Sequence, residues 1–183
     1  ISARFVELAT EMAFTEGLSD LVAFERIDAR KLRFSSEFEG VFSLCEGAFG
    51  LQGGPATQDP ANLRGDQLIL SGMAQALRSG HRLLLAAFSA YFQVHNFENE
   101  ASPVEFDLMT ATRHERTEIR NPQGGILETD LWTTCFTPRE LWLMAETAGL
   151  EPLEIQSVHS GEDWKAESLD LSHAELLLLA RRP

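Results

Sequence analysis

The residues of this 183-residue chain that could do chemistry form no recognisable nucleophilic or metal centre. The sequence has no G-x-S-x-G elbow, and no cysteine is paired persuasively with a histidine. A zinc site needs ligands at short spacings, whereas the histidines are scattered. They are His81, His95, His114, His159 and His173. We therefore expect no metal and no catalytic nucleophile supplied by the protein.

Carboxylates at the ends of predicted strands are more informative. Asp28 follows the strand-like residues 21–27, and Glu46 lies just beyond the apolar residues 40–44. In an open α/β sheet, the carboxyl ends of the strands face the ligand crevice. Asp28 is therefore either a ligand-facing carboxylate or a turn residue, because Asp is common in turns. Taken alone, the turn is favoured, and Glu46 is equally a candidate for a solvated loop carboxylate.

The charge balance excludes some partners. With 28 acidic and 15 basic residues, the formal net charge is -13. Nucleic acids and anionic membranes need Lys and Arg to neutralise phosphates, so neither is expected. The charge is compatible with a small-molecule or cationic substrate, although solubility alone is the favoured explanation. No apolar run approaches the roughly 20 residues that span a bilayer. Cys45 and Cys135 are expected to be buried thiols of a cytoplasmic protein.

Strands and helices alternate through the first half of the chain. Residues 2–16 carry apolar residues at helical spacing on one face, with Ser2 as N-cap and Gly17 at the end. Strands are predicted at 21–27 and 40–44. A helix follows at 65–78, closed by Ser79 and Gly80. Residues 82–88 then form a continuous apolar run, typical of a parallel strand covered on both faces.

Residues 91–135 interrupt this alternation of strands and helices. Two strand-like stretches, 106–120 and 126–135, flank a turn-rich segment at 121–125, which predicts an inserted antiparallel hairpin. The best local signal follows it. Thr137, Pro138 and Glu140 form a capping box with proline at the first helical position, and the helix ends at Gly149.

The order of elements predicts the fold class. Strands at 153–158 and 174–180 follow one another without a helix, so one of them should be antiparallel, at the sheet edge. We expect an α/β fold with a Rossmann-like, mostly parallel sheet, right-handed crossovers and an antiparallel C-terminal strand.

Several segments, in this order, resemble a known family. The segment ALRSGHRLLL is similar to a family pattern L-x-P-G-G-x-L-L, with Ser79 in place of Pro and His81 in place of the second Gly. The segment FTPRELWLMAETAGLEPLEI is similar to its late helix and strand. Together they resemble class I S-adenosylmethionine-dependent methyltransferases, from the second helix of that fold to its C-terminus. The resemblance covers essentially the whole chain, and it implies that the first strands and the glycine-rich cofactor loop are missing.

The resemblance implies one domain over residues 1–183, N-terminally incomplete, with residues 91–135 as a substrate-capping insertion. It also implies that S-adenosylmethionine is the cofactor. Ile1 would pack near the adenine, Asp28 would accept from the adenine amino group, and Ala29 would offer its backbone N–H. The methionine portion would lie beside the end of the strand at 40–44. The residues implied there are Ser43, Leu44, Cys45, Glu46 and Gly47.

The same resemblance implies an acceptor pocket. Phe49 would border it, with Tyr91, Arg116 and Trp132 as further substrate residues. Each has an ordinary alternative: Phe49 as a core residue, Arg116 and His114 as exposed strand residues, and Tyr91 and Trp132 as core aromatics. A general base is needed only if the acceptor must lose a proton, and Glu46 and His114 are the candidates.

Three functions are therefore compared. Methyl transfer from S-adenosylmethionine to a small molecule comes first. A non-catalytic binding module with the same fold is the alternative. A nucleotide-dependent oxidoreductase would need a G-x-G-x-x-G after the first strand, and these residues contain none. The sequence identifies neither the acceptor atom nor the oligomeric state. A sheet without its first two strands would leave the strand at 40–44 with an exposed edge, which favours instability or aggregation.

Overall fold

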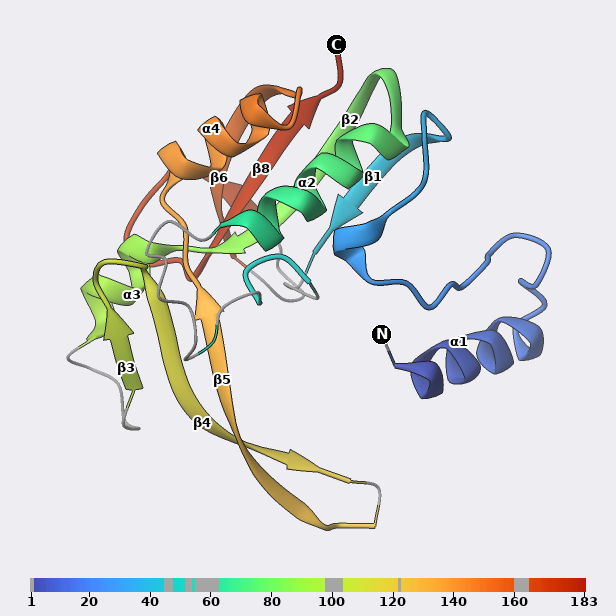
Figure 1. Cartoon of the computed structure of the whole chain (residues 1–183), viewed down its shortest axis with the longest axis horizontal. Helices are drawn as coiled ribbons and strands as arrows, with labels where there is room; N and C mark the ends of the chain where they lie inside the picture. The colour runs from blue at the N-terminus through green and yellow to red at the C-terminus, as the bar shows by residue number, and fades with distance from the viewer. Residues whose placement is uncertain are drawn as a thin grey trace.

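A computed structural model describes residues 2–44, 48–51, 54, 63–97, 104–121, 123–159 and 165–183. Within these residues the fold is α/β (Figure 1). A five-stranded sheet consists of β1 (Phe38–Ser43), β2 (Leu77–Phe88), β8 (Glu175–Arg181), β6 (Glu151–His159) and β7 (Lys165–Glu167), in that spatial order. A three-stranded sheet consists of β3 (Val104–Asp107), β4 (Thr112–Arg120) and β5 (Ile126–Thr134). The helices are α1 (Ala3–Thr15), α2 (Arg64–Ala76), α3 (Ala90–Asn96) and α4 (Pro138–Thr147), with a 3-10 turn η1 (Ala29–Lys31).

The larger sheet is mixed, which corrects the expectation of a mostly parallel one. Among the described strands, only β1 and β2 pair in parallel. The antiparallel strand β8 was expected at the edge, but it lies between β2 and β6 and pairs with both. Its interior position has a physical reason: alternate side chains Leu176, Leu178 and Ala180 are buried in the core. The edges are instead β1 and the short β7.

Residues 21–27 are not a strand, which corrects a second prediction. They run as irregular chain between α1 and η1. A strand needs a neighbour to accept its ladder hydrogen bonds, and no described strand pairs with this segment. Its apolar residues therefore stay accessible: Leu21 is 78% exposed and Phe24 45%.

Helix α1 begins as predicted but buries little. The Ser2 hydroxyl oxygen accepts from the backbone N–H of Phe5, and Gly17 follows the helix with φ +70°. The predicted apolar face is not covered, since Phe5 is 74% exposed and Met12 66%. Only Ala13 of this helix is buried, and Figure 1 shows α1 apart from the sheet.

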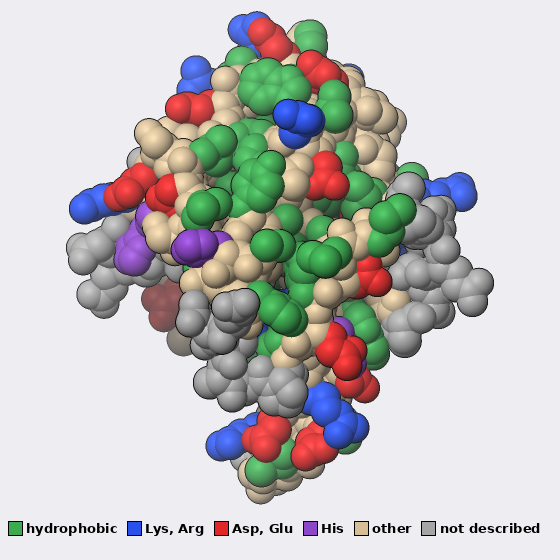
Figure 2. Space-filling view, turned by 90° about the vertical axis from the view of Figure 1, so that its left-hand side faces the viewer, with side chains coloured by type: hydrophobic (Ala, Val, Ile, Leu, Met, Phe, Trp, Pro, Cys, Tyr) green, Lys and Arg blue, Asp and Glu red, His purple; other side chains and the backbone are tan. Residues whose placement is uncertain are grey.

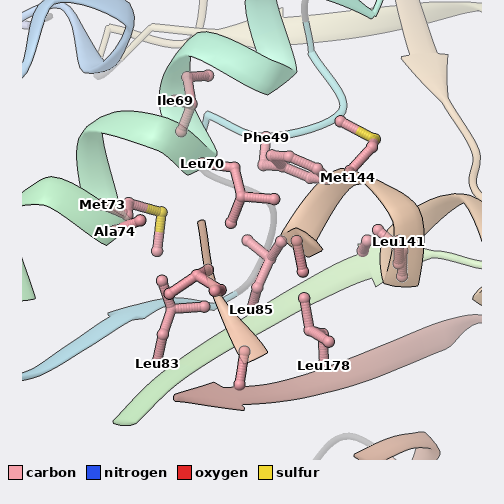
Figure 3. Packing of buried hydrophobic residues seen from close by; sticks show 14 of the residues in the cluster. Phe49, Ile69, Leu70, Met73, Ala74, Leu83, Leu85, Leu141, Met144 and Leu178 are labelled. Carbon is pink, nitrogen blue, oxygen red and sulfur yellow. The ribbon is translucent and has the colours of Figure 1, made fainter. Parts of the chain in front are cut away.

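The core lies between the larger sheet and helices α2 and α4 (Figure 3). Helix α2 ends at Ala76, earlier than predicted, and Ser79 and Gly80 belong to β2 rather than to a helix end. From β2, Leu83 and Leu85 are fully buried, but Leu84 on the opposite face is 36% exposed. The prediction that β2 is covered on both faces is therefore wrong at Leu84.

Helix α4 starts with the predicted capping box. The Thr137 hydroxyl accepts from the Glu140 N–H at 3.2 Å, and the Glu140 carboxylate accepts from the Thr137 N–H at 2.6 Å. These bonds satisfy donors at the helix start that have no partner within the helix. Leu141 and Met144 of this helix then pack into the core.

The second sheet projects away from the first (Figure 1). Strands β4 and β5 pair antiparallel along their whole length. The predicted strand 106–120 is broken, however, because the Asp107 carboxylate accepts from the backbone N–H groups of Met109 and Thr110 and turns the chain. This turn places β3 beside β4. The short helix α3 was not predicted from the sequence.

Candidate functional sites

The three-stranded sheet forms one face of a hollow of about 350 Å³. Glu105 of β3, His114 of β4 and Trp132 of β5 lie directly opposite one another across the strands. The hollow is lined by Gly54, Glu105, Asp107, Thr110, Thr112, His114 and Trp132. Two of the residues predicted for the acceptor side, His114 and Trp132, therefore share one site.

His114 is held by charged and aromatic neighbours. Its Nε2 lies 2.9 Å from Asp130 Oδ1, and its Nδ1 lies 3.4 Å from Glu105 Oε2. Its ring stacks on Trp132, with the centroids 4.7 Å apart and the planes 7° apart. The hydrogen bond to Asp130, followed by that to Glu105, raises the pKa of His114 above its ordinary value. The imidazole can therefore hold a proton at higher pH than an isolated histidine.

The remaining acceptor-side residues are placed differently. Arg116 is beside this group, with its Nε 3.9 Å from Asp130 Oδ1, but its side chain is 75% exposed. Tyr91 lies on α3 and is half-exposed. Phe49 is fully buried and stacks on Phe136 at 4.8 Å, so its ring has no surface to offer a substrate. This burial corrects the assignment of Phe49 to the acceptor pocket in favour of its alternative as a core residue.

A second hollow, of about 340 Å³, lies beside β1 and is mostly apolar. Ala29 of η1 and Ser43 at the end of β1 both line it, so two predicted cofactor residues are brought together. Its other lining residues are Leu32, Phe34, Phe38, Gly40, Val41, Phe42, Ala48, Ile69, Met73 and Ala76. β1 leaves one edge of this region open, because among the described strands it pairs only with β2.

Asp28 caps the turn that carries Ala29. Its carboxylate accepts from the Arg30 backbone N–H at 3.0 Å and from the Arg30 guanidinium at 2.7 Å. These bonds lower the pKa of Asp28 to about 2, so the carboxylate is ionised at neutral pH. The Arg30 Nε also contacts both carboxylate oxygens, at 2.9 and 3.2 Å, so a further donor would have to share or displace one of the Arg30 contacts.

Four predicted residues lie outside the described residues: Ile1, Cys45, Glu46 and Gly47. Leu44, which precedes them, is 47% exposed. Of the two candidate bases, the structure therefore describes His114 but not Glu46.

Asp66 is a buried residue that sequence reasoning missed. It lies in the first turn of α2 and is fully buried. Its Oδ1 accepts from the Gly50 N–H at 2.7 Å, and Oδ2 has no hydrogen-bond partner among the residues that the structure describes. The Gly50 carbonyl in turn accepts from the Thr134 N–H at 2.7 Å. Asp66 thus ties the segment after β1 to the end of β5. An acidic residue in a first helical turn was the only sequence signal for it.

One further group of polar side chains lies near β7. Donor atoms of Glu167, Asp170 and His173 all lie within 4.8 Å of one another. The Asp170 carboxylate already accepts from the backbone N–H groups of Ser172 and His173 and contacts the His173 ring. The Asp170 carboxylate therefore stabilises a turn that includes Ser172 and His173.

Comparisons with known proteins identify the fold class. A scan against protein-family models finds no match, and neither does a search of curated protein sequences. Solved structures do match, and they show that the chain has the fold of S-adenosylmethionine-dependent methyltransferases. No helix in the described part of the chain is long and apolar enough to cross a membrane.

Among these structures, the CcbJ methyltransferase from Streptomyces caelestis is 19% identical, with a TM-score of 0.73; the match covers 99% of this chain and 72% of that one. An S-adenosylmethionine-dependent methyltransferase from Clostridium acetobutylicum is 10% identical, with a TM-score of 0.68 and the same coverage. The [4+2]-cyclase SpnF is 16% identical, with a TM-score of 0.55; the match covers 100% of this chain and 65% of that one. The same fold therefore also carries other chemistry.

Proposed function

We propose that this protein is a methyltransferase that uses S-adenosylmethionine and acts on a small molecule. The observation that carries the proposal is the structural match to the CcbJ methyltransferase over 99% of the chain. Two hollows on this fold give the proposal its sites: one beside β1 for the cofactor and one on the hairpin sheet for the acceptor.

The hollow beside β1 fits the adenosine part of such a cofactor. Its apolar walls suit a flat heteroaromatic ring, and Asp28 next to Ala29 can accept a hydrogen bond at its edge. Ser43 would lie toward the methionine portion, with Leu44, Cys45, Glu46 and Gly47 beyond it. The open edge of β1 supports the expectation that further strands and a glycine-rich loop, with Ile1 near the adenine, complete this site.

The residues of the hairpin sheet would hold the acceptor. When bound, S-adenosylmethionine supplies an activated methyl group, so the protein mainly orients the acceptor and excludes water. Trp132 offers a flat wall, and His114 can take up a proton at a ring nitrogen if the acceptor must lose one. Arg116 and Tyr91 stay candidate substrate contacts, and residues 91–135 stay the proposed cap.

Titration calorimetry with S-adenosylhomocysteine tests the cofactor. The protein as its gene encodes it should bind the compound, and Asp28→Ala should weaken binding by roughly tenfold, the cost of one charge-assisted hydrogen bond. Asp20→Asn, an exposed carboxylate outside both hollows, is the matched control. Absence of binding by the folded wild-type protein would contradict the proposal.

A second candidate is a protein that keeps the fold without transferring a methyl group. The structural match to the [4+2]-cyclase SpnF supports this candidate, because a cyclase shares the fold. A binding module of this kind predicts that Asp28→Ala leaves function intact. Cofactor affinity that depends on Asp28 would argue against it.

A further inference from the structure

We propose that the hollow on the hairpin sheet recognises a cationic group, so that its ligand is a small molecule with a protonated amine beside an apolar body. This inference rests on the proposed function, since it names the class of acceptor for the same site. The charges and the aromatic wall of the hollow support it, independently of the fold.

Carboxylates surround His114 and line the hollow. Glu105 and Asp107 both line the hollow, and Asp130 lies behind His114 at 2.9 Å. The backbone N–H groups of Thr110 and Met109 lower the pKa of Asp107, which keeps that carboxylate ionised. The Glu105 side chain is 87% exposed, so it can reorient toward a ligand without losing a buried contact.

The neighbouring cations do not cancel this charge. Arg113 is paired with Glu115 at 2.9 Å. Arg116 lies beside Asp130 but does not line the hollow and is mostly exposed. Asp130, its partner, does not line the hollow either. Among the lining residues, His114 brings at most one positive charge, when protonated, against the carboxylates of Glu105 and Asp107. The hollow therefore keeps a negative balance, which attracts cations and repels anions.

The hollow also has an aromatic wall. His114 and Trp132 stack almost in parallel, and both line the hollow, so the ring surface that the stacking leaves uncovered is available to an apolar body. Thr110 and Thr112 add hydroxyl groups but no charge. A ligand with one cationic end and one flat end would match both parts, whereas a purely apolar ligand would leave the carboxylates without a partner.

Three indoles that differ in one end group test this inference: tryptamine is cationic, tryptophol is neutral and indole-3-propionate is anionic. Each is titrated into the protein at low salt by ligand-observed NMR. We expect tryptamine to bind about tenfold more tightly than tryptophol, and indole-3-propionate to bind most weakly. Raising the salt should reduce the preference, because these charges are partly exposed.

Variants of the protein separate the site from its overall charge. The double change Glu105→Gln and Asp107→Asn should bring tryptamine and tryptophol to within about twofold, since both side chains keep their size and lose their charge. Glu118→Gln, a carboxylate on the same strand as His114 that pairs with Arg120, is the control and should keep the preference. Circular dichroism confirms that each variant is folded.

The outcomes are distinct. The inference would be overturned if tryptamine and tryptophol bound equally well, or if the preference for tryptamine survived the double change. It would also be overturned if indole-3-propionate bound most tightly, or if no probe bound. Binding of S-adenosylhomocysteine without a cation preference overturns this inference alone. A preference for tryptamine without binding of S-adenosylhomocysteine would contradict methyl transfer but would support the cation-binding site.

Discussion

Asp66 links the segment after β1 to the end of β5, the strand that carries Trp132. Its Oδ1 fixes the Gly50 N–H, and Gly50 in turn accepts from Thr134, two residues beyond Trp132. Gly50 has φ +84°, and a Cβ there would lie 3.1 Å from the Thr134 carbonyl oxygen, so this link requires glycine. Gly50, bonded to the buried carboxyl of Asp66, thus also holds the end of β5.

The buried position of Asp66 predicts a pH-dependent stability. Burial raises the pKa of Asp66 from 3.8 to about 6. Between these values the folded protein retains a proton that the unfolded chain releases, so the free energy of unfolding falls as pH rises through this window. The loss amounts to about 3 kcal/mol when complete.

Asp66→Asn should flatten this slope, since the amide does not ionise yet can still accept from the Gly50 N–H. Urea unfolding at several pH values between about 3.5 and 7.5 measures this slope, because the range extends beyond both pKa values of Asp66. Exposed Asp20→Asn is the control and should keep the wild-type slope. An unchanged slope in Asp66→Asn would rule out Asp66 as its source.

Single residues show why the site could be predicted only in part. Asp28 was placed at the right turn because a carboxylate after an apolar stretch is visible in the sequence. Phe49 and Trp132 could not be separated, because both are aromatic residues near polar segments and only tertiary packing buries one and leaves the other at a hollow. Asp66 was missed since burial of a carboxylate leaves no local signal.

The start of α4 is the element with the most local definition. Thr137 and Glu140 satisfy each other's backbone donors, and α4 carries Leu141 and Met144 into the core. Thr137→Ala should therefore lower the free energy of unfolding by about 1 kcal/mol, the typical worth of an N-cap. Urea denaturation measures the change through the midpoint.

Thr10→Ala is the matched control. Thr10 lies on the exposed face of α1, where its hydroxyl bonds to the Val6 carbonyl within the helix. Loss of that bond should leave stability unchanged or slightly increased, because alanine favours helix. A Thr137→Ala variant as stable as the wild type would mean that the capping box does not limit the stability of the core.

Elements were predictable where their signal is local. The capping box at Thr137 and the N-cap at Ser2 depend on residues within one turn, and both are confirmed. The strand expected at 21–27 failed because a strand needs a partner, which no local pattern supplies. The strand expected at 106–120 failed because the turn at Asp107 competes with extended backbone.

At the scale of the whole molecule, apolar surface and net charge oppose each other. Large apolar residues are exposed on β1 and α1, with Phe42 73% and Phe14 78% accessible. On the side of the molecule away from α1, Figure 2 shows further apolar side chains over the upper body and charged side chains of both signs at the lower end. The net charge of -13 repels copies of the chain from one another, while the open edge of β1 and Phe42 favour association.

This balance predicts self-association that salt promotes. Raising NaCl from about 0.02 M to about 0.5 M shortens the range of charge repulsion severalfold and leaves the apolar attraction in place. Sedimentation velocity should then show larger species at high salt, and Phe42→Lys should weaken their formation by at least about threefold, since a lysine at an edge strand opposes pairing. Leu108→Lys adds the same charge at an 81% exposed position off β1 and should associate like the wild type. Equal association of the two variants would show that β1 is not the contact surface.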